Sequence, residues 1–499
     1  MPINLASPGI VVKEVDLTVG RVDPTSGTIG GLVGPFTKGP VELPTVVTSE
    51  GDLLSAFGKP NSIDKQYETW LVASSFLAYG GSLRVVRADD DDLANGSINN
   101  VGISTTSAEL KIKSTEHYEQ LGYDDNTITN VTVAARNPGS WSNGIRIGLI
   151  DGKADQSLGI STLPSVVTQG LSTSSSNWVG YGITQAFTGI IPGVGTTSEP
   201  GGVLKGIITG VSTAGKATGS ATASTVVEGT LEVKVLSHIS VGGTETPVEY
   251  QPNGIYKFST EVGLSSGATQ VTAGIYINNN SGVAVATGAT VHSANDYFDK
   301  QLLYTASGVP GVASTISSIN WSSIVERPTT TDYTASRGGK NDELHVVVID
   351  GDGGITGNAG TILEKHTGLS KAKDAEFSAG SPSYWRKYLK NNSSYIFGGG
   401  APSGLSTTGY SSGYTEQTDQ GWDQDADGII FGGIGSKNYK IVNGEDYKRN
   451  LNADGTVGVI TTGGLTASVA KLSTGYKLFE NADNYAVDFL LMGSGNHDK

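Results

Sequence analysis

The sequence lacks cysteine altogether, has few charged residues and contains no long apolar run. Without cysteine there are no disulfides, no thiolate zinc sites, no iron–sulfur clusters and no cysteine nucleophile. Charged residues make up 16% of the chain, against about 25% in ordinary soluble domains. No segment approaches the roughly 18 consecutive apolar residues that a membrane-spanning helix needs, so we expect no direct membrane insertion.

The charge that is present is mostly negative. The chain has 33 Lys and Arg against 48 Asp and Glu, a formal net charge of −15. Binding to nucleic acid or to an anionic membrane needs a cationic face, so the charge balance argues against both. The first residues, Met1–Gly9, do not contain a basic stretch followed by an apolar one, so we expect no signal peptide.

The residue patterns predict a multidomain protein of mixed α+β and α/β class, with an α/β core domain built from a discontinuous chain and a large all-β insertion domain. The expected parts are an N-terminal arm (1–22), the core domain (23–95 plus 336–499), a small β-containing segment linked to the core (96–154), and a surface-exposed all-β insertion (155–335). Glycine, serine, threonine and valine dominate the insertion, and charges there are sparse. A sandwich or barrel accounts for its recurring strand patterns, of which Leu231–Leu236 is one, and a disordered Gly/Ser linker is the alternative.

Helix and strand patterns are clearest in the two core segments. Ser49 and Asp52 form a capping-box variant that predicts a helix over Glu50–Phe57, ended at Gly58 by a left-handed cap. A second helix is predicted over Asp64–Tyr79. Its expected buried face consists of residues at helical spacing: Tyr67, Trp70, Leu71, Ser74, Leu77 and Ala78. Strands are expected over Thr28–Gly34, Leu83–Arg87, Val131–Ala135, Ile145–Ile150, Leu344–Ile349 and Tyr395–Phe397, and a short helix over Ser383–Leu389.

The last elements of the core are a predicted helix over Lys477–Ala482 and a predicted strand over Val487–Met492. The strand is a nearly continuous apolar run, which is typical of a parallel sheet covered on both faces. Such a strand normally leads into a crossover helix, and none follows here. We therefore expect either the last strand of a sheet or a truncated chain.

Two acidic segments are candidates for special chemistry. Asp423, Asp425 and Asp427 alternate before Gly428, which matches the first half of a calcium-binding loop. Ile434 stands where the bidentate glutamate should be, and no helix pattern flanks the loop, so a solvated acidic turn is the favoured interpretation and calcium the alternative. The run Asp89–Asp92 is expected to be a solvated loop, because like charges repel one another.

No catalytic constellation stands out, and we expect no enzyme and no cofactor other than the calcium alternative. The segment Gly210–Ala217 resembles a phosphate-binding loop but has Ala217 where a magnesium-binding serine or threonine is required. Two Gly-x-Ser-x-Gly matches, at 263–267 and 409–413, lack the strand-to-helix context of a hydrolase elbow. No two of the six histidines have metal-ligand spacing.

The order of several motifs resembles the N-terminal part of contractile phage tail sheath proteins. In the first 95 residues these motifs are Ser7–Glu14, Gly34-Pro35, Gly39-Pro40, Pro44, Ser49, Phe57-Gly58, Phe76, Tyr79–Gly81 and Arg84–Arg87. Later stretches that look similar are Asn137–Gly144, Lys387–Phe397 and Tyr485–Gly493. Together they cover roughly half of the chain. The segment 155–335 departs from the family's common core, and the family's C-terminal domain is expected to be absent or shortened.

The resemblance implies a structural subunit that polymerises helically around an inner tube and contracts to drive the tube through the host envelope. It implies neighbouring sheath subunits, the inner tail tube protein, and baseplate and tail terminator proteins as partners. It also implies a place in the virion tail after assembly in the host cytoplasm. The residues expected to form a strand donated to a neighbour are Ile10, Val11, Val12, Lys13 and Glu14. The alternative is that this strand pairs within its own domain. The competing hypothesis is a β-rich surface module that recognises a glycan or host receptor through 155–335.

Overall fold

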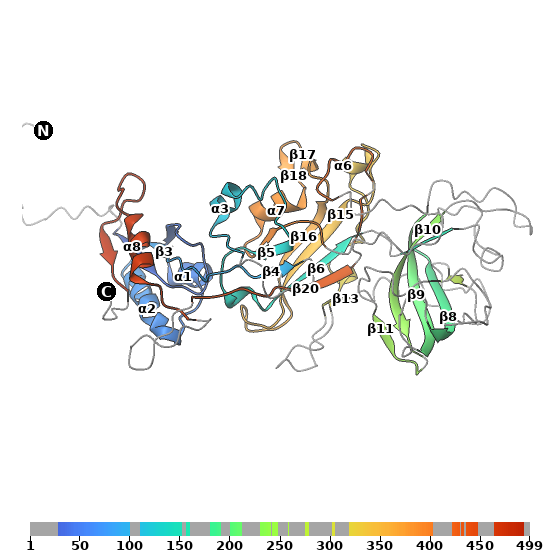
Figure 1. The fold of residues 1–499 in the computed structure, drawn as a ribbon, viewed down its shortest axis with the longest axis horizontal. Helices are drawn as coiled ribbons and strands as arrows, with labels where there is room; N and C mark the ends of the chain where they lie inside the picture. The colour runs from blue at the N-terminus through green and yellow to red at the C-terminus, as the bar shows by residue number, and fades with distance from the viewer. Residues whose placement is uncertain are drawn as a thin grey trace, which may run out of the picture.

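The computed structural model of the chain is shown in Figure 1. The residues it describes are 28–99, 110–151, 156–159, 180–190, 200–211, 230–240, 242–247, 258, 275–278, 302–304, 319–402, 422–429, 431–433, 436–447 and 464–493. The predicted donated strand, residues 10–14, lies outside them. Within this described part no helix is long and apolar enough to span a membrane.

The N-terminal domain is a four-stranded sheet covered by helices on both faces. Its strand order is β2 (Thr45–Val47), β3 (Ser82–Arg87), β1 (Ile29–Gly34), β21 (Phe489–Leu491), with β3, β1 and β21 parallel and β2 antiparallel to β3. Successive side chains of β1 point to opposite faces, so Leu32 packs with the helices α1 (Glu50–Phe57) and α2 (Gln66–Ala78), and Val33 with α8 (Val469–Lys477). The first and last described segments of the chain therefore share one sheet (Figure 1).

The central domain contains two further sheets. One has the order β16 (Thr361–Ser370), β15 (Glu343–Asp350), β6 (Ile145–Asp151), β20 (Ser436–Lys440), and the other β19 (Ile396–Gly398), β5 (Val131–Ala135), β4 (Ser97–Asn99). The helix α7 (Trp385–Asn392) contributes Trp385 and Leu389 to their shared core. The short elements of this part are α3 (Thr115–Gln120), α6 (Asp332–Ala335), β17 (Glu376–Ser378) and β18 (Ser381–Pro382).

A six-stranded antiparallel sheet lies at the far end of the molecule in Figure 1. Its path is β11 (Glu245–Pro247), β10 (Thr230–Ile239), β9 (Pro200–Val211), β8 (Gly182–Ile190), β12 (Tyr276–Asn278), with β7 (Gln156–Gly159) paired to β10. The strands β13 (Leu302–Tyr304) and β14 (Ile319–Asn320) are not part of this six-stranded sheet. Leu303 and Trp321 pack against Ile150, Val347 and Ile349 of the central sheet, although the sequence placed them in the β-rich segment.

Asp151 links the central sheet to the six-stranded sheet. Its carboxylate lies 2.9 Å from the ammonium of Lys371, and both side chains are fully buried. Its main-chain carbonyl accepts a hydrogen bond of 3.2 Å from Lys234 of β10. Because a buried charge needs a partner, the ion pair between Asp151 and Lys371 holds the end of β6 in place.

Most of the predicted core elements are confirmed within a few residues. The helix α1 begins at Glu50 after Ser49, whose hydroxyl accepts a hydrogen bond from the main-chain N–H of Asp52 at 3.1 Å. Gly58 has the expected positive φ of 83°, but its ψ of −177° is extended, so the cap is not left-handed helical. The last helix is wrong in position, since α8 covers 469–477 rather than 477–482.

The buried face of α2 differs from the predicted one. Trp70 and Leu77 are buried as expected, but Tyr67 and Leu71 are exposed, and Thr69 and Ala73 are buried in their place. The reason is the glycine-rich strand beneath the helix. The methyl group of Thr69 occupies the space where a Cβ at Gly34 would stand, so small helix residues make the close approach.

Candidate functional site

The outer edge of β21 is the first candidate site. The strand pairs with β1 in the register Gly30 with Phe489, Gly31 with Leu490, and Leu32 with Leu491. Its start is fixed by two reciprocal hydrogen bonds: the N–H of Asp488 donates to the carbonyl of Ile29 at 2.8 Å, and the N–H of Ile29 donates to the Asp488 carboxylate at 2.9 Å. At its end, the hydroxyl of Tyr476 donates to the carbonyl of Leu491 at 2.6 Å.

This edge is both open and apolar. β21 is the last strand of its sheet in the described part of the chain, and Phe489, Leu490 and Met492 are 55%, 54% and 61% exposed. The prediction of a strand covered on both faces is therefore wrong, although the parallel pairing is right. The residues of β1 that lie opposite Phe489 and Leu490 are Gly30 and Gly31, which have no side chains that could cover those two residues. A bare apolar edge of this kind is suited to receive another strand.

The second candidate site is the joint between the N-terminal and central domains, where Arg87 is completely buried at the end of β3. Its guanidinium donates hydrogen bonds to the carbonyls of Pro138, at 2.7 Å, and Gly39, at 3.1 Å. It also lies 5.7 Å from the ring centroid of Tyr447, whose hydroxyl donates to the carbonyl of Ala88. Burial raises the pKa of Tyr447 to about 12, so this hydroxyl stays protonated.

Lys38 forms a second contact across the same joint. Its ammonium lies 5.1 Å from the ring centroid of Trp141 and 5.0 Å from that of Tyr395, and it donates to the carbonyl of Ser55 at 3.2 Å. Burial lowers the pKa of Lys38, and the nearby carboxylate of Glu364 opposes that shift. Four of the motifs that carry the family resemblance thus meet here: Gly39-Pro40, Arg84–Arg87, Asn137–Gly144 and Lys387–Phe397.

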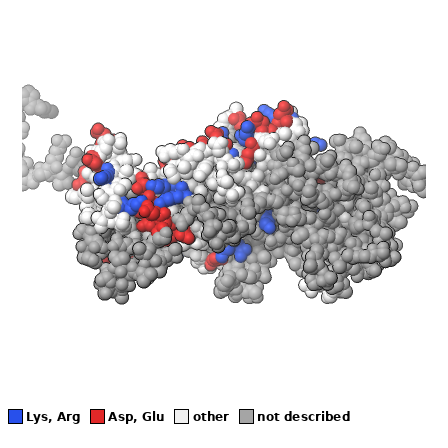
Figure 2. All heavy atoms as spheres, in the orientation of Figure 1, with Lys and Arg blue, Asp and Glu red and all other residues white. Residues whose placement is uncertain are grey.

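An ion cluster beside the joint contradicts one prediction. Asp89 is buried rather than solvated, with Lys111, Lys113 and Lys471 at 2.7, 3.0 and 3.6 Å. Burial alone would raise the pKa of Asp89, but hydrogen bonds from Lys111 and Lys113 and their positive charges outweigh it, so this pKa lies below its usual range. Asp92 is also buried, whereas Asp91 is exposed. On the face shown in Figure 2, acidic and basic side chains lie next to one another.

The three aspartates of the calcium hypothesis do not converge. The carboxylate of Asp423 accepts a hydrogen bond from the hydroxyl of Tyr384 and lies 3.5 Å from the Nε of Arg386. Asp425 is exposed and lies 3.6 Å from Lys373, and Asp427 is exposed. Across the described residues, no group of three or more His, Asp or Glu side chains could hold a metal ion. The structure thus pairs Asp423 and Asp425 with protein groups, and calcium at this turn stays a prediction.

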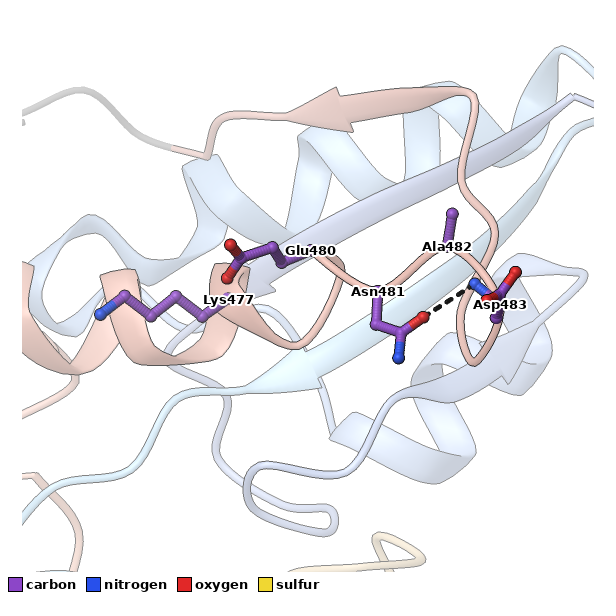
Figure 3. A pocket seen from close by; sticks show the side chains of 5 residues that line it. All are labelled: Lys477, Glu480, Asn481, Ala482 and Asp483. Atoms are coloured by element: carbon purple, nitrogen blue, oxygen red, sulfur yellow. Dashed lines mark hydrogen bonds between the residues drawn. The ribbon is translucent and has the colours of Figure 1, made fainter.

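A shallow hollow of about 430 Å³ follows α8 (Figure 3). It is lined by Lys477, Glu480, Asn481, Ala482 and Asp483. The side-chain oxygen of Asn481 accepts a hydrogen bond from the N–H of Asp483 at 3.0 Å, which closes a turn. The side chains drawn in Figure 3 do not form a nucleophile–base pair, and the hollow offers no recognisable catalytic arrangement.

Three curated proteins share sequence with this chain, and all three are named tail sheath protein. The protein of Enterobacteria phage T4 is 41% identical over 95 residues, which are 19% of this chain and 14% of the T4 protein. The chain is related to phage tail sheath proteins over this part of its length. The Vibrio phage KVP40 protein is 40% identical over 97 residues, 19% of this chain and 14% of its own length. The Salmonella phage ViI protein is 30% identical over 146 residues, which are 29% of this chain and 21% of the ViI protein.

These matches span about a seventh to a fifth of the length of the tail sheath relatives. None of the three carries the name of an enzyme, in agreement with the prediction of a structural protein. No family model matches the chain. Among solved structures, the sheath tail protein of Listeria innocua is 15% identical, with 44% of this chain and 35% of that chain covered and a TM-score of 0.15, a score too low to support an argument.

Proposed function

We propose that this chain is a structural subunit of a contractile phage tail sheath, which polymerises helically around an inner tail tube. The observation that carries the proposal is the 41% identity with the T4 tail sheath protein over 95 residues. The subunit would be part of the virion tail and would be assembled in the host cytoplasm, with baseplate and tail terminator proteins at the two ends of the sheath.

The open edge of β21 supports a mechanism for polymerisation. The segment Ile10–Glu14 of one subunit adds as a strand to β21 of its neighbour, so main-chain hydrogen bonds and the apolar side chains of Phe489 and Leu490 hold the two together. Such a contact joins two different surfaces, the arm of one copy and the edge of the next. Repeated without closure, a contact of this kind generates a helical filament.

The joint at Arg87 and Lys38 supports contraction by rigid subunits. Contraction would repack the subunits into a lattice of lower free energy, with the work coming from the difference between interfaces and with no cofactor. The buried contact of Arg87 with Pro138 and the half-buried contact of Lys38 with Trp141 would keep the N-terminal and central domains together during that change. The tube would be driven through the host envelope as the sheath shortens.

The six-stranded sheet would be an outer decoration of this sheath. Figure 1 draws it beyond the central domain, at the opposite end from β21. In this proposal the N-terminal and central domains form a core from discontinuous parts of the chain, and the strands within 156–278 belong to an insertion. The core would make the contacts of the polymer, and the insertion would face the surroundings.

Electron microscopy of the purified chain tests the proposal. The intact chain is expected to form striated tubes as its concentration is raised, and a variant lacking residues 1–15 is expected to remain monomeric with an unchanged circular dichroism spectrum. An intact chain that stays monomeric at every concentration contradicts the proposal. Tubes formed by the shortened variant contradict the role of the arm.

A further inference from the structure

We propose that His345 is an acid-sensitive switch in the central domain: its neutral ring holds Gly368 of β16 in place, and protonation of the ring opens this end of β16. The inference goes beyond the proposed function and does not rest on it. It is carried by the hydrogen bonds of a single buried imidazole on β15, which is not part of the β21 edge or of the joint at Arg87.

The hydrogen bonds of His345 define the protonation state of its ring. The Nε2 atom lies 3.1 Å from the carbonyl oxygen of Glu326, and because a carbonyl can only accept, Nε2 carries a proton. The main-chain N–H of Gly368 donates to Nδ1 at 3.0 Å, so Nδ1 carries a lone pair. Both ring nitrogens are therefore satisfied in one neutral tautomer. A second proton, on Nδ1, would face the N–H of Gly368, donor against donor.

Gly368 lies at an irregular point in the pairing of β15 with β16. The pairs on either side of this point are Leu344 with Leu369 and Val346 with His366. One residue of β15, His345, therefore faces two residues of β16, which is the count of a β-bulge. Gly368 has a φ of 69°, a conformation that glycine adopts without strain. The ring of His345 accepts the N–H of this bulge and so fixes its conformation.

The ring lies in an apolar part of the central sheet. His345 is 2% exposed, and the residue opposite it on β6 is Ile150. Ile150 packs with Trp321 and Val347 in one buried cluster. A charged imidazole loses its hydration in such a place, so burial favours the neutral ring.

Glu343 is the charged group that faces the ring. Its carboxylate lies 3.9 Å from Nε2 and also accepts hydrogen bonds from the N–H and the hydroxyl of Thr329, at 2.7 and 3.2 Å. The loop before β15 presents the carbonyl of Glu326 to the ring, and β16 presents the N–H of Gly368. Burial lowers the pKa of His345, and the charge of Glu343 opposes this shift without reversing it. The ring is therefore neutral at pH 7 and takes up a proton below about pH 6.5.

Protonation breaks one contact of the ring and keeps the other. With a proton on each nitrogen, Nε2 still donates to the carbonyl of Glu326, whereas Nδ1 can no longer accept from Gly368. In the described part of the chain β16 is an edge strand, so the segment 367–370 can leave β15 without disturbing another strand. The next residue is Lys371, which forms the buried ion pair with Asp151. The opening therefore starts beside the link between the central and six-stranded sheets.

Hydrogen exchange followed by mass spectrometry tests the switch in the intact chain. The peptides compared cover 361–371 in β16 and, as an internal reference, 145–151 in β6, at about pH 7.5 and about pH 5, with rates corrected for the intrinsic effect of pH. The opened state has an ordinary histidine pKa of about 6.5, so opening becomes up to about tenfold more frequent for each pH unit below that value, until the pKa of the closed state is reached. We expect the corrected exchange of 361–371 to be at least about threefold faster at the lower pH and that of 145–151 to be unchanged. Equal corrected exchange of 361–371 at both pH values overturns the proposal.

Two substitutions separate His345 from the other buried histidine of this sheet. Glutamine does not titrate, so His345→Gln is expected to exchange 361–371 at the same corrected rate at both pH values, even if the variant is less stable. His366→Gln is the matched control, because His366 is also buried, lies on β16 itself and has its Nε2 3.0 Å from the Glu364 carboxylate. This control should keep the acid-dependent exchange. An acid response that His345→Gln retains, or that His366→Gln abolishes, overturns the proposal.

Nitrogen NMR of the chain labelled in its histidine rings tests the protonation state directly. The signals that are missing from His345→Gln, or from His345→Asn if the first variant folds poorly, identify the ring. We expect a proton on Nε2 and none on Nδ1 at about pH 7.5, and a second proton only below about pH 6.5, over the range in which exchange increases. A ring that carries its proton on Nδ1, or that is already charged at about pH 7.5, contradicts the switch.

Discussion

The main chain of Ile29 and that of Asp488 are joined by a hydrogen bond of 2.8 Å, and the Asp488 carboxylate accepts the N–H of Ile29 in return. These residues are 459 positions apart. The first described strand, β1, is therefore aligned with the last one, β21, at their starts. In the same pairing, Phe489 and Leu490 lie opposite Gly30 and Gly31 of β1, and both side chains stay exposed.

Leu490→Lys is expected to block assembly without unfolding the subunit. The side chain is 54% exposed, so its replacement changes the free energy of unfolding by under about 1 kcal/mol, but it places a desolvated charge in the proposed contact between the arm of one subunit and β21 of its neighbour. The concentration needed for tube formation, followed by light scattering, should rise at least about tenfold. Val46→Lys on β2 is the matched control, because Val46 is 55% exposed on the opposite edge strand of the same sheet. Equal effects of the two substitutions would argue against a specific role for β21.

Asp89→Asn is expected to destabilise the joint between the domains. The substitution leaves the positive charges of Lys111, Lys113 and Lys471 facing one another around a buried amide, at a cost of about 1–3 kcal/mol. Asp91→Asn removes only a contact of an exposed carboxylate with Lys471, which solvent screens, and should leave the free energy of unfolding almost unchanged. Urea denaturation of the two variants at pH 7 measures the difference.

The cost of Asp89→Asn should also depend on pH. The folded-state pKa of Asp89 lies below its unfolded value of about 3.9, so its stabilising contribution is complete above that value and is lost as the pH falls through the folded pKa. The gap in stability between wild type and variant is therefore constant from pH 5 to 8 and narrows below about pH 4. If the difference in stability between wild type and Asp89→Asn narrowed as the pH rises, groups other than the Asp89 carboxylate would be responsible for it.

Arg87→Lys is expected to be far from conservative. A lysine cannot reach the carbonyls of Pro138 and Gly39 in the planar geometry of the guanidinium, so buried acceptors lose their donors, at about 2–4 kcal/mol. Arg84→Lys is the control on the same strand, because Arg84 is only half-buried and contacts the Tyr485 ring at 5.6 Å and the carbonyl of Ala486. Its cost should stay under about 1 kcal/mol. Similar melting temperatures for both variants would contradict a special contribution of Arg87 to the stability of the joint.

Local sequence signals predicted the elements whose causes are local. Ser49 and Asp52 fix the start of α1 by their own hydrogen bond, and the predicted strands Val131–Ala135 and Leu344–Ile349 correspond to β5 and to the interior of β15. One of the strands predicted within 155–335, Leu231–Leu236, falls within β10. The relation to tail sheath proteins also came from local motifs taken in order.

What the sequence did not predict depends on distant partners. The burial of Asp89 requires lysines from segments near residues 111 and 471, and no run of four aspartates indicates them. The exposed edge at Phe489 and Leu490 depends on the glycines of β1, which lie opposite them only after β21 has joined the sheet. The joint at Lys38 depends on Trp141 and Tyr395, which are more than a hundred residues away.

Asp423→Asn and Asp425→Asn distinguish the acidic turn from a calcium loop. In the structure Asp423 is the acceptor for Tyr384 and the ion-pair partner of the nearly buried Arg386, so its substitution should cost about 2–4 kcal/mol with or without calcium. Asp425 is 62% exposed beside a lysine that is also exposed, so its substitution should cost under about 0.5 kcal/mol. Calcium and a chelator should give the wild-type chain the same melting temperature, because the contacts of Asp423 and Asp425 are with Tyr384, Arg386 and Lys373. A calcium-dependent rise in melting temperature that both substitutions abolish would instead restore the metal site, since only a shared ion makes an exposed and a paired carboxylate equally important.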